Sequence, residues 1–140
     1  MDRETGEIIW ILGGEGDEFG LSDEEKFSRQ HHARFTDDGY LTIYDNGVEN
    51  EDSRAIKLLL DEDNKKILEF NSYDVENFYK YTGSVQEIDS DNDVFLIGVG
   101  TEVGVDQDLV AIEKNYSTNE TYFTFSFESG ENLYRIYKFK

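Results

Sequence analysis

Short apolar runs separated by turn residues are the feature that most constrains the fold of this chain. Residues 8–12, 40–44 and 94–99 are rich in aliphatic and aromatic side chains, and each run borders Gly, Asn or Asp. Runs of this length and composition, bounded by turn residues, are typical of β-strands. Helical patterns are limited to single turns at 22–28 and 74–81, short of the roughly ten residues that define a helix. The sequence therefore predicts an all-β protein.

The predicted strands fall into two groups of similar construction. The first group spans 33–71 and the second spans 84–128, and each holds four strands joined by tight acidic turns. The groups begin about 50 residues apart, which is near the spacing of four-stranded antiparallel blades in β-propellers. Two further strands are expected at 7–13 and 132–139. We therefore expect one all-β domain over 1–140, built as a partial propeller of two blades plus two extra strands.

A closed or sandwiched ten-stranded β domain is the alternative fold that the same strand count allows. A propeller needs about four blades or more to close its ring, so two blades would belong to a larger ring or need partners. Open blade edges invite strand pairing. A homo-oligomer that completes a ring is therefore one expected assembly.

The net charge of the chain limits the classes of partner that it can bind. The sequence carries 13 Lys and Arg against 32 Asp and Glu, a net charge of −19 with neutral histidines. Such a surface repels phosphate backbones and anionic lipid headgroups, so we expect neither nucleic acid nor membrane as partner. The absence of cysteine excludes disulfides, thiolate nucleophiles and cysteine-bound metals. Its 10 Phe, 9 Tyr and 1 Trp distinguish the chain from a disordered acidic segment. No signal peptide or membrane span is recognisable, and the compartment stays open.

A window free of acidic residues, 26–36, interrupts this negative charge. It contains three cationic side chains and both histidines of the protein: Lys26, Arg29, His31, His32 and Arg34. Guanidinium groups match tetrahedral oxyanions, and a neutral imidazole can act as a nucleophile or general base. The window therefore predicts an anion-binding pocket. A solvated loop before a strand, with one histidine in the core, is the alternative interpretation.

Four short motifs within the first part of the chain carry a resemblance to a known family. They are Gly-Glu-Ile-Ile-Trp-Ile-Leu-Gly-Gly at 6–14, Gln-His-His-Ala-Arg at 30–34, Asp-Asn-Gly at 45–47 and Ser-Arg-Ala at 53–55. In this order they resemble the arylsulfotransferase (ASST-type, arylsulfate sulfotransferase) family of β-propeller proteins. Residues 83–100 and 134–139 are similar to the final blades of that family, so the resemblance extends from residue 5 to residue 139.

The resemblance implies sulfuryl transfer from an aryl sulfate to a phenol without a nucleotide donor, through a transiently sulfated histidine. By motif position, His31 is the implied nucleophile, and Arg34 and Arg54 would stabilise charge or support the structure. Candidate substrate contacts are the neighbouring side chains Arg29, Gln30 and His32. Sulfuryl transfer, like phosphoryl transfer, requires mainly positioning and charge neutralisation, so we expect no metal and no cofactor.

The chain also departs from the family. Members of the family carry an H-x-N element and a further arginine upstream of the strand that holds Trp10, whereas this sequence has only His31 and His32. His32 also stands where the family commonly has an acidic residue. Since one oxyanion donor is worth about 3 kcal/mol, we expect the chain alone to show little or no turnover.

Two functions of other classes remain open at this point. The chain could be a non-catalytic propeller fragment that binds a ligand or partner, or an acidic protein that mimics nucleic acid. The second ranks last, because the acidic residues sit in turns rather than along one strand face. The acidic turn at 89–93 has the start of a calcium loop, but Val94 and Gly100 occupy the positions of its essential Gly and Glu.

Overall fold

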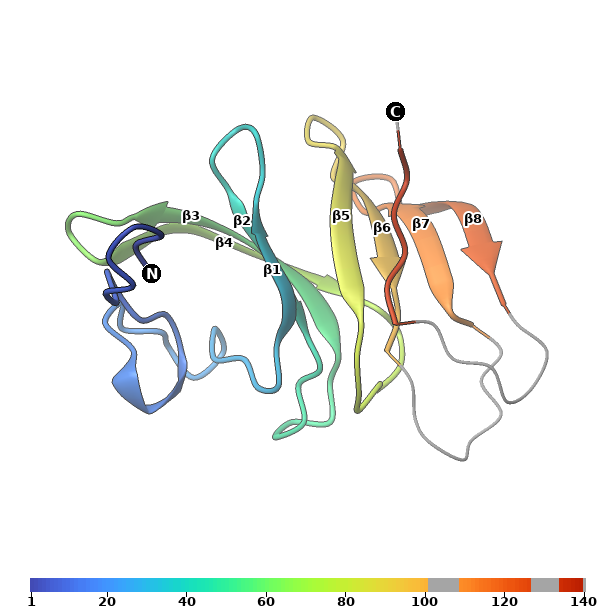
Figure 1. Cartoon of the computed structure of the whole chain (residues 1–140). Helices are drawn as coiled ribbons and strands as arrows, with labels where there is room; N and C mark the ends of the chain where they lie inside the picture. The colour runs from blue at the N-terminus through green and yellow to red at the C-terminus, as the bar shows by residue number, and fades with distance from the viewer. Residues whose placement is uncertain (101–108, 127–133, 140) are drawn as a thin grey trace.

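The computed structural model describes residues 1–100, 109–126 and 134–139. It contains two four-stranded antiparallel sheets, in agreement with the predicted all-β fold (Figure 1). The elements are η1 (Gly14–Gly16), β1 (His31–Phe35), β2 (Leu41–Asp45), β3 (Arg54–Asp61), β4 (Lys66–Asp74), β5 (Ser84–Asp89), β6 (Val94–Gly98), β7 (Ala111–Asn115) and β8 (Glu120–Phe125). In the described part of the chain, no helix has the length and apolar character to cross a membrane.

Each sheet follows the order of the chain. The strand orders are β1-β2-β3-β4 and β5-β6-β7-β8, and every neighbouring pair is antiparallel. Tight polar turns make these connections possible. Between β3 and β4, the Asp61 carboxylate accepts the backbone N–H of Asn64 at 3.0 Å, and Lys65 adopts a left-handed φ of 53°. Two such four-stranded meanders pack face to face, an arrangement that is consistent with the expected propeller-type blades.

The two sheets share one hydrophobic core. Tyr44 and Ala55 from the first sheet pack against Val85, Phe95 and Ile97 from the second, and all five are essentially inaccessible to solvent. Alternation along the strands produces this arrangement, because every second residue of a strand faces the same side. Each large apolar side chain buried in this way contributes about 1.5–3 kcal/mol, so the interface fixes the blades relative to each other.

The opposite face of the first sheet is covered by the N-terminal segment. Leu12 and Phe27 pack on a second apolar cluster, whose buried members are Leu41, Ile43, Ile56 and Leu58. The register places these four residues on alternate positions to the shared core. The central strands β2 and β3 are therefore buried on both faces, whereas the edge strands β1 and β4 are largely exposed.

Neither of the two extra strands expected at 7–13 and 132–139 forms in the described residues. Residues 7–13 and the described residues 134–139 are irregular, and 132–133 lie outside the described residues. Nearby side chains take the place of a strand partner. Glu18 Oε2 accepts the backbone N–H of Ile11 at 2.6 Å, and Asp17 Oδ1 accepts that of Gly13 at 2.8 Å. The apolar pattern predicts a strand, but no sheet edge among the described residues pairs with it.

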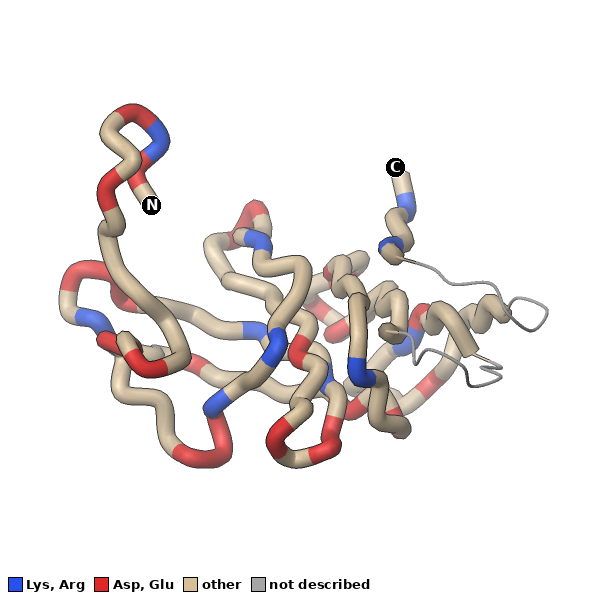
Figure 2. Tube along the Cα trace, turned by 60° about the horizontal axis from the view of Figure 1, so that its bottom comes forward, with Lys and Arg blue, Asp and Glu red and all other residues tan. Residues whose placement is uncertain are grey.

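The charged side chains follow the turns. Many acidic residues lie in the loops that connect the strands, as Figure 2 shows. Inside the molecule, charges are paired: Lys57 and Glu87, whose side chains are 7% and 8% exposed, form an ion pair that joins β3 to β5. This pair lies beside the edge where β1 and β5 run next to each other, and that edge holds the candidate site.

Candidate functional site

A β-bulge in β1 positions the two histidines. His31 is opposite Tyr44 in β2, whereas Arg34 is opposite Thr42, so two residues of β1 face one residue of its partner. His32 occupies the bulge with a left-handed φ of 55°. Cross-strand partners share a face of the sheet, and Tyr44 faces the second sheet. Because of the bulge, the side chains of His31, His32 and Arg34 all lie on the side of β1 that faces β5.

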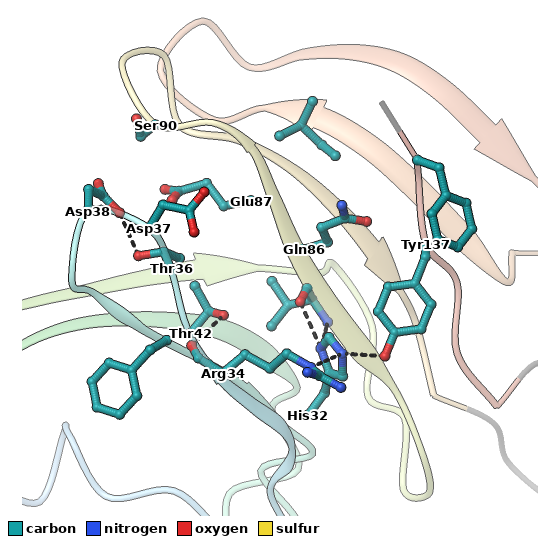
Figure 3. Close-up of a pocket in the computed structure, with 14 residues that line it drawn as sticks. His32, Arg34, Thr36, Asp37, Asp38, Thr42, Gln86, Glu87, Ser90 and Tyr137 are labelled. Atoms are coloured by element: carbon teal, nitrogen blue, oxygen red, sulfur yellow. Dashed lines mark hydrogen bonds between the residues drawn. The ribbon is translucent and has the colours of Figure 1, made fainter.

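His32 is the buried histidine of the pair. Its ring is 8% exposed, and its Nδ1 lies 2.8 Å from the carbonyl oxygen of Val85, while the Val85 amide nitrogen is farther away at 3.2 Å. Arg34 Nε donates to Nε2 at 3.2 Å (Figure 3). Because a guanidinium can only donate, Nε2 must accept, and Nδ1 carries the proton that the Val85 carbonyl accepts. Burial, followed by the charges of Arg34 and Arg135, lowers the pKa of His32.

His31 is half-buried at the start of β1. Burial lowers its pKa from the model-compound value of 6.5, and the positive charge of Arg135 lowers it further. Arg135 belongs to the C-terminal segment, 134–139, which lies along β5 (Figure 1). His31 is therefore a neutral imidazole near pH 7, partly open to solvent and close to a cation.

A pocket of about 550 Å³ opens beside His32. Its walls come from β1, the β1–β2 turn, β5 and the C-terminal segment. His32, Arg34 and Tyr137 gather at one end, and the carboxylates of Asp37 and Glu87 lie at the other (Figure 3). The pocket thus has a cationic and hydrogen-bonding end and an acidic end.

The other residues predicted for the site lie elsewhere. Arg54 Nε pairs with the carboxylate of Asp45 at 3.1 Å, and its terminal nitrogens donate to the carbonyl oxygens of Glu24 and Lys26 at 3.0 and 2.7 Å. Arg29 and Gln30 are exposed just before β1 and do not line the pocket. His31 does not line it either, although it is the direct neighbour of His32. The structure brings His31, His32 and Arg34 together and gives Arg54 a structural partner.

Sequence reasoning missed Arg135 and Tyr137. Tyr137 Oη lies 2.8 Å from His32 Nε2, and the two rings meet edge to face at 5.3 Å. The available signal was the spacing of these two residues, since residues two apart in an extended segment point to the same side. Within 1–100, 109–126 and 134–139, no group of three or more His, Asp or Glu side chains is arranged to hold a metal ion.

The fold and this cluster define an all-β protein with two neutral histidines and Arg34 on the edge strand β1, beside β5 of the second sheet. The sequence model of the family described as Arylsulfotransferase (ASST) matches residues 1–107 of the chain. The match covers well over half of the chain, and the chain belongs to the arylsulfotransferase family. It matches no curated protein and no solved structure.

Proposed function

We propose that this chain takes part in nucleotide-independent sulfuryl transfer from an aryl sulfate to a phenol, with His31 as the nucleophile. The observation that supports this role is the half-buried imidazole of His31 beside the charge of Arg135. A neutral imidazole has a free electron pair for attack on sulfur. A neighbouring guanidinium can balance the negative charge on the sulfuryl oxygens.

The proposed reaction has two balanced steps. The unprotonated nitrogen of His31 attacks sulfur, an N–S bond forms, and the S–O bond to the aryl group breaks to release a phenolate. The oxygen of an acceptor phenol then attacks the same sulfur, the N–S bond breaks, and the phenol proton passes to solvent. The imidazole is regenerated, so no net proton or electron is consumed.

The neighbouring residues have separate proposed roles. His32 and Arg34 form one hydrogen-bonded unit, in which Arg34 is the charge-stabilising group and His32 orients it. Arg29 and Gln30, at the entrance to β1, remain candidate substrate contacts. Arg54 is assigned to structure, because its donors are already bound to Asp45 and to two backbone carbonyls.

We further propose that the site needs groups from additional blades. The sequence has only two histidines, which are adjacent, and no H-x-N element. A homo-oligomer that completes a ring could supply further copies of His31, His32 and Arg34, whereas an H-x-N element would have to come from a different chain. The chain alone is therefore expected to be sulfated far faster than it turns over.

The test measures sulfation and turnover separately. The protein is mixed with ³⁵S-labelled nitrophenyl sulfate, first alone and then with a phenol acceptor. We expect one labelled histidine per chain at most and little steady release of nitrophenol. His31→Ala should abolish labelling, whereas Lys66→Gln on the outer strand β4 should not change it. Label that survives in His31→Ala would contradict the proposed nucleophile, and rapid turnover by the wild-type chain would contradict its incompleteness.

A binding module without chemistry is the second candidate function. It is favoured by the full set of contacts around His32 and Arg54, which are typical of structural residues. In the same experiment, this function predicts that nitrophenyl sulfate binds but never transfers its label.

A further inference from the structure

The C-terminal segment, 134–139, is held against β5 by side chains that replace a strand partner. The Gln86 amide donates to the carbonyl oxygen of Lys138 at 3.0 Å and accepts its N–H at 2.8 Å. Ser84 Oγ accepts the N–H of Ile136 at 3.2 Å. These contacts fix the segment at every second residue, so the intervening side chains have defined positions.

The intervening residues, Arg135 and Tyr137, project toward the histidines. Tyr137 meets His32 through its hydroxyl and its ring. Arg135 lies two residues earlier and therefore on the same side of the extended segment. Its charge acts on both His31 and His32, since it contributes to the lowered pKa of each. Arg135 is thus a neighbour of both rings.

Arg135 has no acidic partner among the described residues. In the part of the chain that the structure describes, neither Arg34 nor Arg135 forms an ion pair, although Asp and Glu are abundant in the sequence. The Nε of Arg135 is buried and has no hydrogen-bond acceptor among the described residues. The ring of Tyr134 lies 4.9 Å from the guanidinium carbon. A buried donor without an acceptor is unusual in a folded protein and indicates that a ligand can supply one.

We propose that Arg135 and Arg34 form an oxyanion-binding site around the two histidines, in which Arg135 is the second guanidinium that holds a sulfate monoester. Planar guanidinium groups bind tetrahedral oxyanions through two parallel N–H donors, and the charge makes these hydrogen bonds stronger than neutral ones. The site rests on the proposed sulfuryl-transfer function, and it adds a residue that lies outside the four motifs at 6–14, 30–34, 45–47 and 53–55.

The charged and titratable groups around Arg135 support a site for an anion. The charge of Arg135 acts on His31 and His32 of β1, Arg34 is hydrogen-bonded to His32, and Tyr137 and Tyr134 flank Arg135 on its own segment. A hydrogen bond with Tyr137 raises the pKa of Arg135. On the β5 side, Lys138 is already paired with Glu113 at 2.8 Å. The Glu113 carboxylate is therefore occupied by another cation.

Binding can be measured without any turnover. The ¹H–¹⁵N NMR signals of His31 and His32 are followed while inorganic sulfate, and then nitrophenyl sulfate without acceptor, is added. In the wild-type chain, we expect both anions to raise the two histidine pKa values, because a nearby negative charge favours the protonated ring. In Arg135→Gln, the pKa of His31 should rise before any ligand is added, and the affinity for both anions should fall about ten-fold or more.

Three controls separate this site from general effects of charge or folding. Lys66→Gln removes the same charge on β4 and should leave both affinities unchanged. Arg135→Lys keeps the positive charge but loses the two parallel N–H donors of the guanidinium. This variant should bind both anions with intermediate affinity. The Gln86 side-chain amide signals report whether the C-terminal segment is still docked in each variant.

The outcomes distinguish this inference from the proposed function. Unchanged affinity in Arg135→Gln, with the segment docked, would overturn the site, even if His31 is still sulfated. Loss of affinity together with an absence of sulfohistidine in the wild-type chain would support the site and contradict the sulfuryl-transfer function. An equal loss in Lys66→Gln would also overturn it, because the effect would then come from net charge.

Discussion

The hydroxyl oxygen of Tyr137 lies 2.8 Å from Nε2 of His32, which joins two residues 105 positions apart in the sequence. This contact connects the C-terminal segment to the bulge of β1, across β5. Three parts of the chain therefore define the candidate site together. The positions of the two imidazoles therefore depend on β5 and the C-terminal segment as well as on the histidine motif.

Removing the Tyr137 hydroxyl should weaken this connection. We expect Tyr137→Phe to lower the free energy of unfolding by about 1 kcal/mol, the typical net value of one hydrogen bond. Urea denaturation, followed by tyrosine fluorescence or circular dichroism, measures the change. Tyr81→Phe, which alters a partly exposed ring away from the site, is the matched control. Equal stability of Tyr137→Phe and the wild type would show that the contact contributes nothing.

The two histidines should make the fold less stable in mild acid. Burial lowers the pKa of both rings below 6.5, so the unfolded chain binds more protons than the folded chain. Their stabilising contribution is complete above the unfolded pKa and is lost as the pH falls through the folded values. Each histidine can change the unfolding free energy by at most about 1.4 kcal/mol per pH unit.

Denaturation at about pH 7.5 and about pH 5.5 tests this dependence. We expect His31→Gln to lose less stability than the wild type between the two conditions. Asp45 has the opposite sign at lower pH, since burial raises its pKa, but it is common to both proteins and cancels in the comparison. A steeper loss in the variant would contradict the predicted sign.

Arg54 should matter for stability more than for sulfuryl transfer. Its removal leaves the Asp45 carboxylate, whose side chain is 2% exposed, without its ion pair. Breaking a buried pair on one side costs about 3–5 kcal/mol, so we expect a loss of that order in Arg54→Ala. The double variant Arg54→Ala with Asp45→Asn removes the unpaired charge and should recover part of it. A fully stable Arg54→Ala that fails to become sulfated would instead assign Arg54 to the site.

The N-terminal segment should promote self-association. Ile8, Ile9 and Ile11 are 66%, 55% and 38% exposed, and such a run of apolar side chains favours contact with another surface. We expect light scattering to give a mass above the 16.2 kDa of one chain, with Ile9→Lys shifting it toward the monomer. Glu4→Lys, which changes charge in the same segment without removing an apolar side chain, should not. A wild-type mass of one chain at high concentration would count against a completed ring.

The regular part of this fold could be predicted from sequence, and its ends could not. The strands at 40–44 and 94–99 are recognisable because alternation, β-branched residues and turn residues agree with one another there. The segment around Trp10 has the same composition, yet in the part of the chain that the structure describes it has no strand partner. Composition indicates that a segment can pair, whereas pairing also requires an open sheet edge within reach.

The candidate site, like the fold, could be predicted only in part from the sequence. The acid-free window predicts that His31, His32 and Arg34 lie near one another, since they are close in sequence. Arg135 could not be connected to them, because that contact depends on the docking of a segment about a hundred residues away. The role of Arg54 could not be decided from the sequence for a related reason. Only the three-dimensional structure reveals that its partner is Asp45.

Because β1 contains a bulge, the geometry of the site depends on the number of residues in this strand. Because His32 and Ala33 together oppose a single position of β2, the strand has one residue more than regular pairing needs. Deleting Ala33 would restore plain alternation and force one imidazole to the far side of the sheet, with no amino acid of the motif chemically altered. Relatives of this chain can therefore lose the geometry through a one-codon deletion while retaining both histidines.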